Sequence, residues 1–110
     1  VGTGNKVEDY GVGFYTKYGD GGVDIAPIAD LYKSEVWDLG KSLGIDSRII
    51  EAKPTDGLWD DGRTDEDQLG ATYSELEEAM ETGKGTGLKV LEEYARMNAH
   101  KMNPIPTFTL

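Results

Sequence analysis

The chain has 110 residues, enough for one domain or part of one and too few for two. Its 21 acidic side chains outnumber its 11 basic ones, and the net charge of -10 argues against nucleic-acid backbones and anionic membrane surfaces as partners. The absence of cysteine excludes disulfides, thiolate metal sites and thiol catalysis, and makes a cytoplasmic location the expected one.

The first residues predict a chain that starts inside a longer fold. Val1 is not a natural initiator, and Val1-Gly2-Thr3-Gly4 is typical of a strand that runs into a phosphate-type turn. We expect neither a secretory leader nor a membrane span, because no apolar run approaches the necessary length.

Two short elements are expected next. Asn5 and Glu8 have the spacing of a capping box, which predicts a short helix from about residue 6 that Gly11 and Gly13 end early. The apolar residues of 25–31 predict a brief or edge strand, because the proline among them donates no ladder hydrogen bond.

The clearest helix signal follows Asp30, the expected N-cap, and Gly44 is positioned to close that helix. Its apolar residues fall at spacings of four, three and four, which is one face of a helix: Tyr32, Val36, Leu39 and Leu43. Asp46 predicts a second cap and a short helix that ends before Pro54. A loop is expected from Thr55 onward.

Capping patterns also mark the second half of the chain. Thr64 predicts a short helix that ends at Gly70, and Ser74 with Glu77 has capping-box spacing for the next one. From Leu88 a broad apolar face predicts roughly four turns, and the proline-containing tail of residues 105–110 is expected to lie as a strap over a surface. The predicted strands are too few to form an α/β core unaided. We therefore expect more chain or a second subunit to complete the core.

Glycines crowd the first 22 residues, where they suit either a flexible connector or a loop whose main chain approaches a ligand. Lys17, Asp20 and Asp24 flank these glycines and favour a polar ligand.

Three further residues have two readings each. Glu8 is a helix cap or an oxygen ligand for Mg²⁺, Lys33 is a solvated lysine or a phosphate contact, and His100 is a surface residue or a ligand contact. The acids of residues 60–67 do not match the ligand positions of an EF-hand, which we reject.

The order of the motifs along nearly the whole chain resembles the C-terminal part of ammonia-dependent NAD synthetases. The motifs are Gly2-Thr3-Gly4-Asn5-Lys6, Glu8, Phe14-Tyr15-Thr16-Lys17-Tyr18-Gly19-Asp20-Gly21, Asp24, Pro27, Leu31-Tyr32-Lys33, Lys53-Pro54-Thr55, Leu58-Trp59, Asp65-Glu66, Leu69-Gly70, Tyr73 and His100-Lys101.

This resemblance implies an α/β fold of the N-type ATP pyrophosphatases, an adenine-nucleotide alpha-hydrolase-like, Rossmann-like parallel sheet flanked by helices, in a homodimer. Residues 1–110 then form the mostly helical C-terminal part of a single domain. The implied reaction uses ATP and Mg²⁺ to adenylate the nicotinate carboxylate of deamido-NAD with release of pyrophosphate, and ammonia then displaces AMP.

The resemblance also implies roles for individual residues. ATP contacts are expected at Thr3, Lys33 and Thr55, and the Mg²⁺ ligand at Glu8. Contacts to deamido-NAD are expected at Lys17, Asp24, His100 and Lys101, and Asp20 is the expected catalytic residue that handles ammonia or the nicotinate end.

Two departures from the family pattern matter. The phosphate-binding loop Ser-Gly-Gly-x-Asp-Ser is absent from this sequence, so we expect the chain alone to be inactive. Gln68 stands where many members have a second glutamate before Leu-Gly. The alternative hypothesis is a non-catalytic acidic module on the same scaffold that binds a nucleotide or a protein partner.

Overall fold

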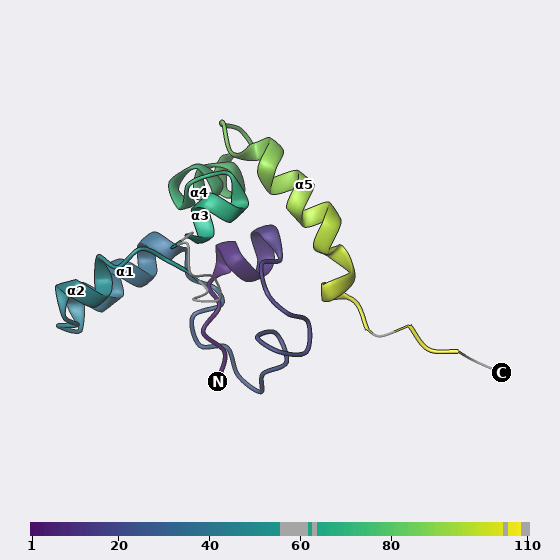
Figure 1. The fold of residues 1–110 in the computed structure, drawn as a ribbon, viewed down its shortest axis with the longest axis horizontal. Helices are drawn as coiled ribbons and strands as arrows, with labels where there is room; N and C mark the ends of the chain where they lie inside the picture. Colours follow the sequence, from purple (N-terminus) through teal and green to yellow (C-terminus); the bar gives the residue numbers. More distant parts are fainter. Residues whose placement is uncertain (56–61, 63, 105, 109–110) are drawn as a thin grey trace.

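The computed structural model describes residues 1–55, 62, 64–104 and 106–108, and within these residues it contains helices, turns and no strand (Figure 1). The elements are a π-helix η1 (Val7–Val12), α-helices α1 (Lys33–Ser42), α2 (Ser47–Ile50), α3 (Asp65–Leu69), α4 (Tyr73–Thr82) and α5 (Leu88–Asn98), and a 3-10 helix η2 (Ala99–Met102). Within the described part of the chain, no helix is both long and apolar enough to cross a bilayer.

The first helix starts as the sequence predicts. The Asn5 side chain accepts hydrogen bonds from the main-chain N–H groups of Val7 (3.0 Å) and Glu8 (3.2 Å), and the Glu8 carboxylate accepts one from the Asn5 N–H (3.2 Å). Gly13 ends the helix in the left-handed region (φ 67°). Gly11 lies inside the helix, where a Cβ atom would come within 2.8 Å of the Met80 sulfur, so it lets η1 lie close to α4.

The hydrophobic core forms where η1 meets α4 and α5 (Figure 1). Its buried members are Val7, Val12, Leu69, Ala71, Tyr73 and Leu76, and further apolar residues pack partly buried against them, including Phe14, Met80, Leu91 and Tyr94. The core therefore joins the start of the chain to its second half, and η1 is fixed from both sides.

The predicted helix of residues 32–43 is confirmed as α1, but its cap differs. Asp30 does not cap it, because the Tyr32 N–H instead donates to the Glu35 carboxylate (2.9 Å). The apolar face of α1 stays largely uncovered within the described part of the chain, with Leu39 44% and Leu43 70% exposed. Figure 1 shows α1 and α2 projecting from the rest of the structure.

The caps of α2 and α3 are confirmed. Asp46 accepts from the Arg48 N–H (2.8 Å), and Thr64 forms a reciprocal capping box with Asp67 before Gly70 ends α3 at φ 80°.

The predicted cap of α4 was wrong, because Thr72 and Glu75 cap the helix two residues earlier than expected. The Glu77 carboxylate instead accepts from both the main-chain N–H and the hydroxyl of Ser34, each at 2.9 Å. This contact ties the start of α1 to α4.

The predicted strand of residues 25–31 was wrong. Residues 27–30 form a turn, and Ala29 and Leu31 donate to main-chain carbonyls only three residues earlier. The described tail residues 106–108 are in no helix, are exposed and run away from the helices, with Phe108 89% exposed, so a strap over another surface stays a prediction (Figure 1). Residues 105 and 109–110 of that prediction lie outside the described residues.

Candidate functional site

An open cavity of about 370 Å³ lies between the first residues, η1 and the glycine-rich loop. Three predicted site residues line it: Thr3, Glu8 and Asp20. Their neighbours include Asp9 and the aromatic rings of Phe14 and Tyr15. The cavity thus combines carboxylates with the segment of residues 2–4.

A second cavity of about 330 Å³ adjoins the first, because both are lined by Asp9 and Asp20. It collects three more charged residues of the prediction: Lys17, Asp24 and Lys101. Together the two cavities bring six of the predicted residues into one continuous region from segments that lie far apart in the sequence.

The glycines of this region mostly serve close packing rather than unusual backbone angles. A Cβ atom at Gly4 would collide with the Asp9 carboxylate, and one at Gly21 would lie 2.6 Å from the Tyr15 ring. Neither glycine has a positive φ. Packing of the protein's own side chains therefore explains glycine at these positions as well as the predicted approach of a ligand to the main chain does.

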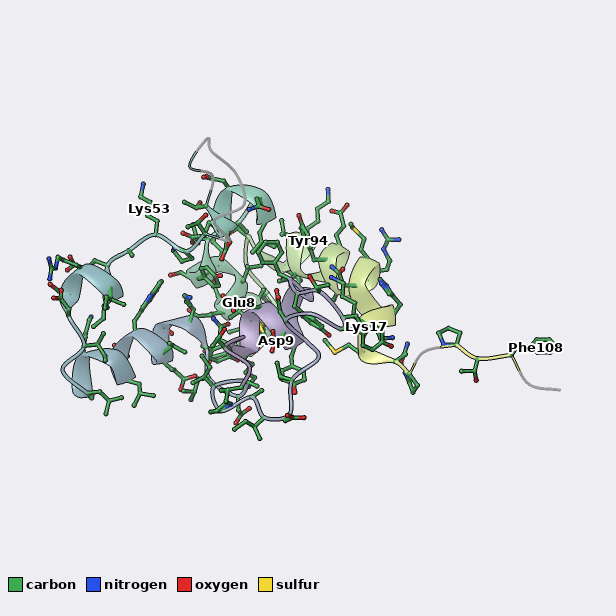
Figure 2. All side chains as sticks on the ribbon, turned by 60° about the horizontal axis from the view of Figure 1, so that its bottom comes forward. Glu8, Asp9, Lys17, Lys53, Tyr94 and Phe108 are labelled. Atoms are coloured by element: carbon green, nitrogen blue, oxygen red, sulfur yellow. The ribbon has the colours of Figure 1, made fainter. Side chains whose placement is uncertain are left out.

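Asp9 is the site residue that sequence reasoning missed. It lines both cavities, and Figure 2 shows it beside Glu8 on η1. Burial, followed by the negative charges of Glu8 and Asp20, raises the pKa of the Asp9 carboxyl above its ordinary value of 3.8. No motif marks Asp9, because its position between the cavities depends on how the loop after η1 folds back over that helix.

The Asp9→Asn variant is expected to be more stable than the wild-type chain at pH 7. A carboxyl with a raised folded-state pKa holds its proton more tightly in the folded than in the unfolded chain, so ionised Asp9 destabilises the fold. That penalty fades as the pH falls through the folded-state pKa, and the advantage of the variant should shrink with it. Urea unfolding at pH 7 and near pH 4 measures both effects, with the exposed Asp38→Asn as control. A gain that is the same at both pH values would contradict this account.

Glu8 is the centre of a second contact group, which joins three helices. Its Oε1 accepts a hydrogen bond from the Tyr73 hydroxyl of α4 (2.7 Å) and lies 3.7 Å from the Lys33 ammonium of α1. That ammonium also lies 5.4 Å from the centre of the Tyr73 ring. Burial and the nearby charges of Glu8 and Asp65 raise the pKa of Tyr73 far above its usual range, so its hydroxyl keeps its proton and remains a donor.

Two lysines tie the glycine-rich loop to the end of the chain's last long helix. Lys17 donates to the main-chain carbonyls of His100 (2.8 Å) and Asn103. Lys101 donates in the opposite direction to the carbonyl of Gly13 (2.8 Å), and burial lowers its pKa. His100 contributes its main chain here, and its side chain is exposed and lines neither cavity.

Thr55 is one of three predicted contacts that line neither cavity, with Lys33 and His100. It is exposed, and its neighbour Lys53 lies well away from Glu8 and Asp9 in Figure 2. Leu58-Trp59 of the same motif lies outside the described residues. Lys33 also lines neither cavity, although it reaches Glu8.

The donor set around Glu8 suits a magnesium ion that shares its ligands with a substrate. Within the described part of the chain, no group of three or more carboxylate or imidazole side chains stands ready to hold a metal. Mg²⁺ characteristically takes one or two carboxylates and completes its shell with phosphate oxygens and water. Glu8 at the cavity wall fits that requirement, and the Lys33 ammonium lies 3.7 Å from its carboxylate.

Comparison with known proteins shows the family of this chain. Residues 1–106 match the sequence model of the NAD synthase family. The NH3-dependent NAD(+) synthetase of Archaeoglobus fulgidus is 48% identical over 105 residues, covering 96% of this chain and 38% of that protein. The corresponding enzyme of Alkaliphilus oremlandii is 46% identical over 110 residues, covering 97% and 43%. This chain belongs to the NAD synthase family.

A solved structure shows the same fold. The NMN synthetase of Francisella tularensis matches 99% of this chain with a TM-score of 0.82 and 38% sequence identity, and the match covers 46% of that chain. The chain therefore spans less than half the length of these relatives.

Proposed function

We propose that residues 1–110 are the C-terminal part of a single NAD synthetase domain, which amidates deamido-NAD with ammonia at the expense of ATP. The observation that carries this proposal is the convergence of Thr3, Glu8, Asp20 and Lys17 on two adjoining cavities in a chain of this family. The remainder of the domain supplies the Rossmann-like parallel sheet and the phosphate-binding loop, and the enzyme works as a homodimer.

The charges at the first cavity suit the adenylation step. Glu8 holds Mg²⁺, which neutralises the pyrophosphate leaving group when it is bound, and Thr3 contacts ATP. Lys33 lies 3.7 Å from Glu8, so its ammonium would be close enough to contact phosphates held by a metal at Glu8.

The second cavity suits deamido-NAD. Lys17 and Lys101 present cations, Asp24 presents a carboxylate, and Asp20 lies where the two cavities join. Asp20 there handles the ammonia that displaces AMP from the adenylated carboxylate. Because nucleotide and dinucleotide occupy adjoining spaces, the reacting carboxylate and the α-phosphate come together without a large rearrangement.

The test is NAD formation by the full-length protein that carries this chain, supplied with deamido-NAD, ATP and ammonia. We expect NAD, AMP and pyrophosphate in equal amounts. Since one matching structure is an NMN synthetase, nicotinate mononucleotide is offered in parallel, and a preference for it changes the substrate but keeps the reaction class. Binding of ATP without any amide product from either substrate would favour the non-catalytic module. So would a reading frame with no Ser-Gly-Gly-x-Asp-Ser sequence upstream.

A further inference from the structure

We propose that Tyr73 is a positioning residue that holds the Glu8 carboxylate in place for the metal ion, an inference that rests on the proposed function of Glu8. Its hydroxyl donates to Glu8 Oε1 at 2.7 Å, across 65 residues of sequence. This is the shortest of the hydrogen bonds that the structure gives to the Glu8 side chain.

The Tyr73 ring has little freedom to place its hydroxyl elsewhere. It is 1% exposed, and it packs in an edge-to-face arrangement with Trp37, with ring centres 6.3 Å apart. Its main-chain N–H donates to the Glu66 carboxylate at 2.7 Å, which fixes the first turn of α4. Asp65 Oδ2 lies 3.4 Å from the hydroxyl, a longer contact than the one to Glu8.

Glu8 is held at both oxygens. Oε1 accepts from Tyr73, and Oε2 accepts from the Asn5 N–H at 3.2 Å. Each oxygen keeps a lone pair for a further ligand, because a carboxylate oxygen accepts about two bonds. These two donors hold the carboxylate at the cavity wall independently of the Lys33 ammonium. Mutation of a hydrogen-bond partner of a metal ligand typically lowers metal affinity by about 10–100-fold.

Tyr73 is also a core residue, so the test must separate positioning from packing. Tyr73→Phe keeps the ring and removes only the hydroxyl. Tyr94→Phe is the matched control, because the Tyr94 hydroxyl also makes one hydrogen bond, to the Gln68 carbonyl at 3.0 Å, and its ring also packs on the core.

The experiment measures Mn²⁺ binding by electron paramagnetic resonance to the full-length protein, in the presence of an ATP analogue with a methylene bridge between the α- and β-phosphorus atoms. We expect Tyr73→Phe to bind Mn²⁺ about 10–100-fold more weakly. Tyr94→Phe should bind it as the wild type does. In the Glu8→Gln background, Tyr73→Phe should have no further effect, because the tyrosine acts through Glu8.

Unchanged Mn²⁺ affinity in a folded Tyr73→Phe protein overturns the proposal, and so does an equal loss in Tyr94→Phe. If Tyr73→Phe does not fold, wild-type protein labelled with ¹³Cζ-tyrosine carries the test. Mg²⁺ with the analogue should then shift the Tyr73 resonance and leave that of Tyr94 in place, and an unshifted Tyr73 overturns the proposal. If the protein forms NAD but fails these tests, the proposed role of Tyr73 is refuted and the proposed function stands. If the wild type makes no amide, the proposed function is refuted.

Discussion

Replacing Glu8 by glutamine is expected to lower the rate of NAD formation by the full-length protein by at least about 100-fold. Loss of a metal ligand removes several kcal/mol of charge stabilisation in the transition state, and each 1.36 kcal/mol is tenfold in rate. Glutamine keeps the shape of the side chain and an oxygen for the Tyr73 hydroxyl, so the fold should survive. Steady-state rates at saturating ATP, deamido-NAD and ammonia measure the loss.

This substitution separates the two readings of Glu8. Glutamine serves as well as glutamate at the third position of a capping box, so a residue that only caps η1 would lose almost nothing. Glu92→Gln on the exposed side of α5 makes the same charge change and should leave the rate unchanged. Full activity in Glu8→Gln would therefore show that Glu8 only caps η1 and would contradict its role as a metal ligand.

Replacing Leu76 by alanine is expected to destabilise the chain by about 2–5 kcal/mol. Leu76 is fully buried in the core between η1 and α4, so alanine leaves a cavity there. Whole domains are stable by only about 5–15 kcal/mol, so much of this chain should unfold under mild conditions. Urea unfolding followed by circular dichroism measures the loss.

Leu39→Ala on α1 is the matched control for this variant. Leu39 is 44% exposed, so the same loss of side-chain atoms should cost the isolated chain much less. Equal losses for Leu76→Ala and Leu39→Ala would contradict a core centred on η1, α4 and α5.

Helix ends were the most predictable part of the fold, because a cap is a local interaction. Asp46 and Thr64 cap their helices as their sequences predict. The start of α4 was missed since Thr72-x-x-Glu75 and Ser74-x-x-Glu77 offer the same spacing within a few residues. Thr72 and Glu75 form the cap, while Glu77 contacts Ser34, 43 residues away. No local pattern reveals that contact.

The site was predicted in part for a similar reason. Resemblance to the family placed Thr3, Glu8 and Asp20, which the structure gathers at one cavity. The resemblance did not predict a role for Asp9 or for the Tyr73 hydroxyl, since both roles depend on segments that meet only in the folded chain. The cavities alone give no account of the ATP contact predicted at Thr55.

The loop glycines show the limit of composition as a signal. Their number predicts either a flexible connector or a loop whose main chain a ligand approaches, and approach of a ligand stays a prediction. The groups that lie close to Gly4 and Gly21 are side chains of η1 and of the loop, namely Asp9 and Tyr15. Composition indicates that some group lies close to the glycine main chain, but only the fold shows which group it is.

The most direct test of the account is a crystal structure of the full-length protein with Mg²⁺, a non-reacting ATP analogue and deamido-NAD. We expect the metal at coordination distance from Glu8, the triphosphate beside Thr3 and Lys33, and the nicotinate carboxylate near Asp20 at the junction of the two cavities. Both nucleotides bound away from this region, with Glu8 still paired only to Lys33 and Tyr73, would contradict it.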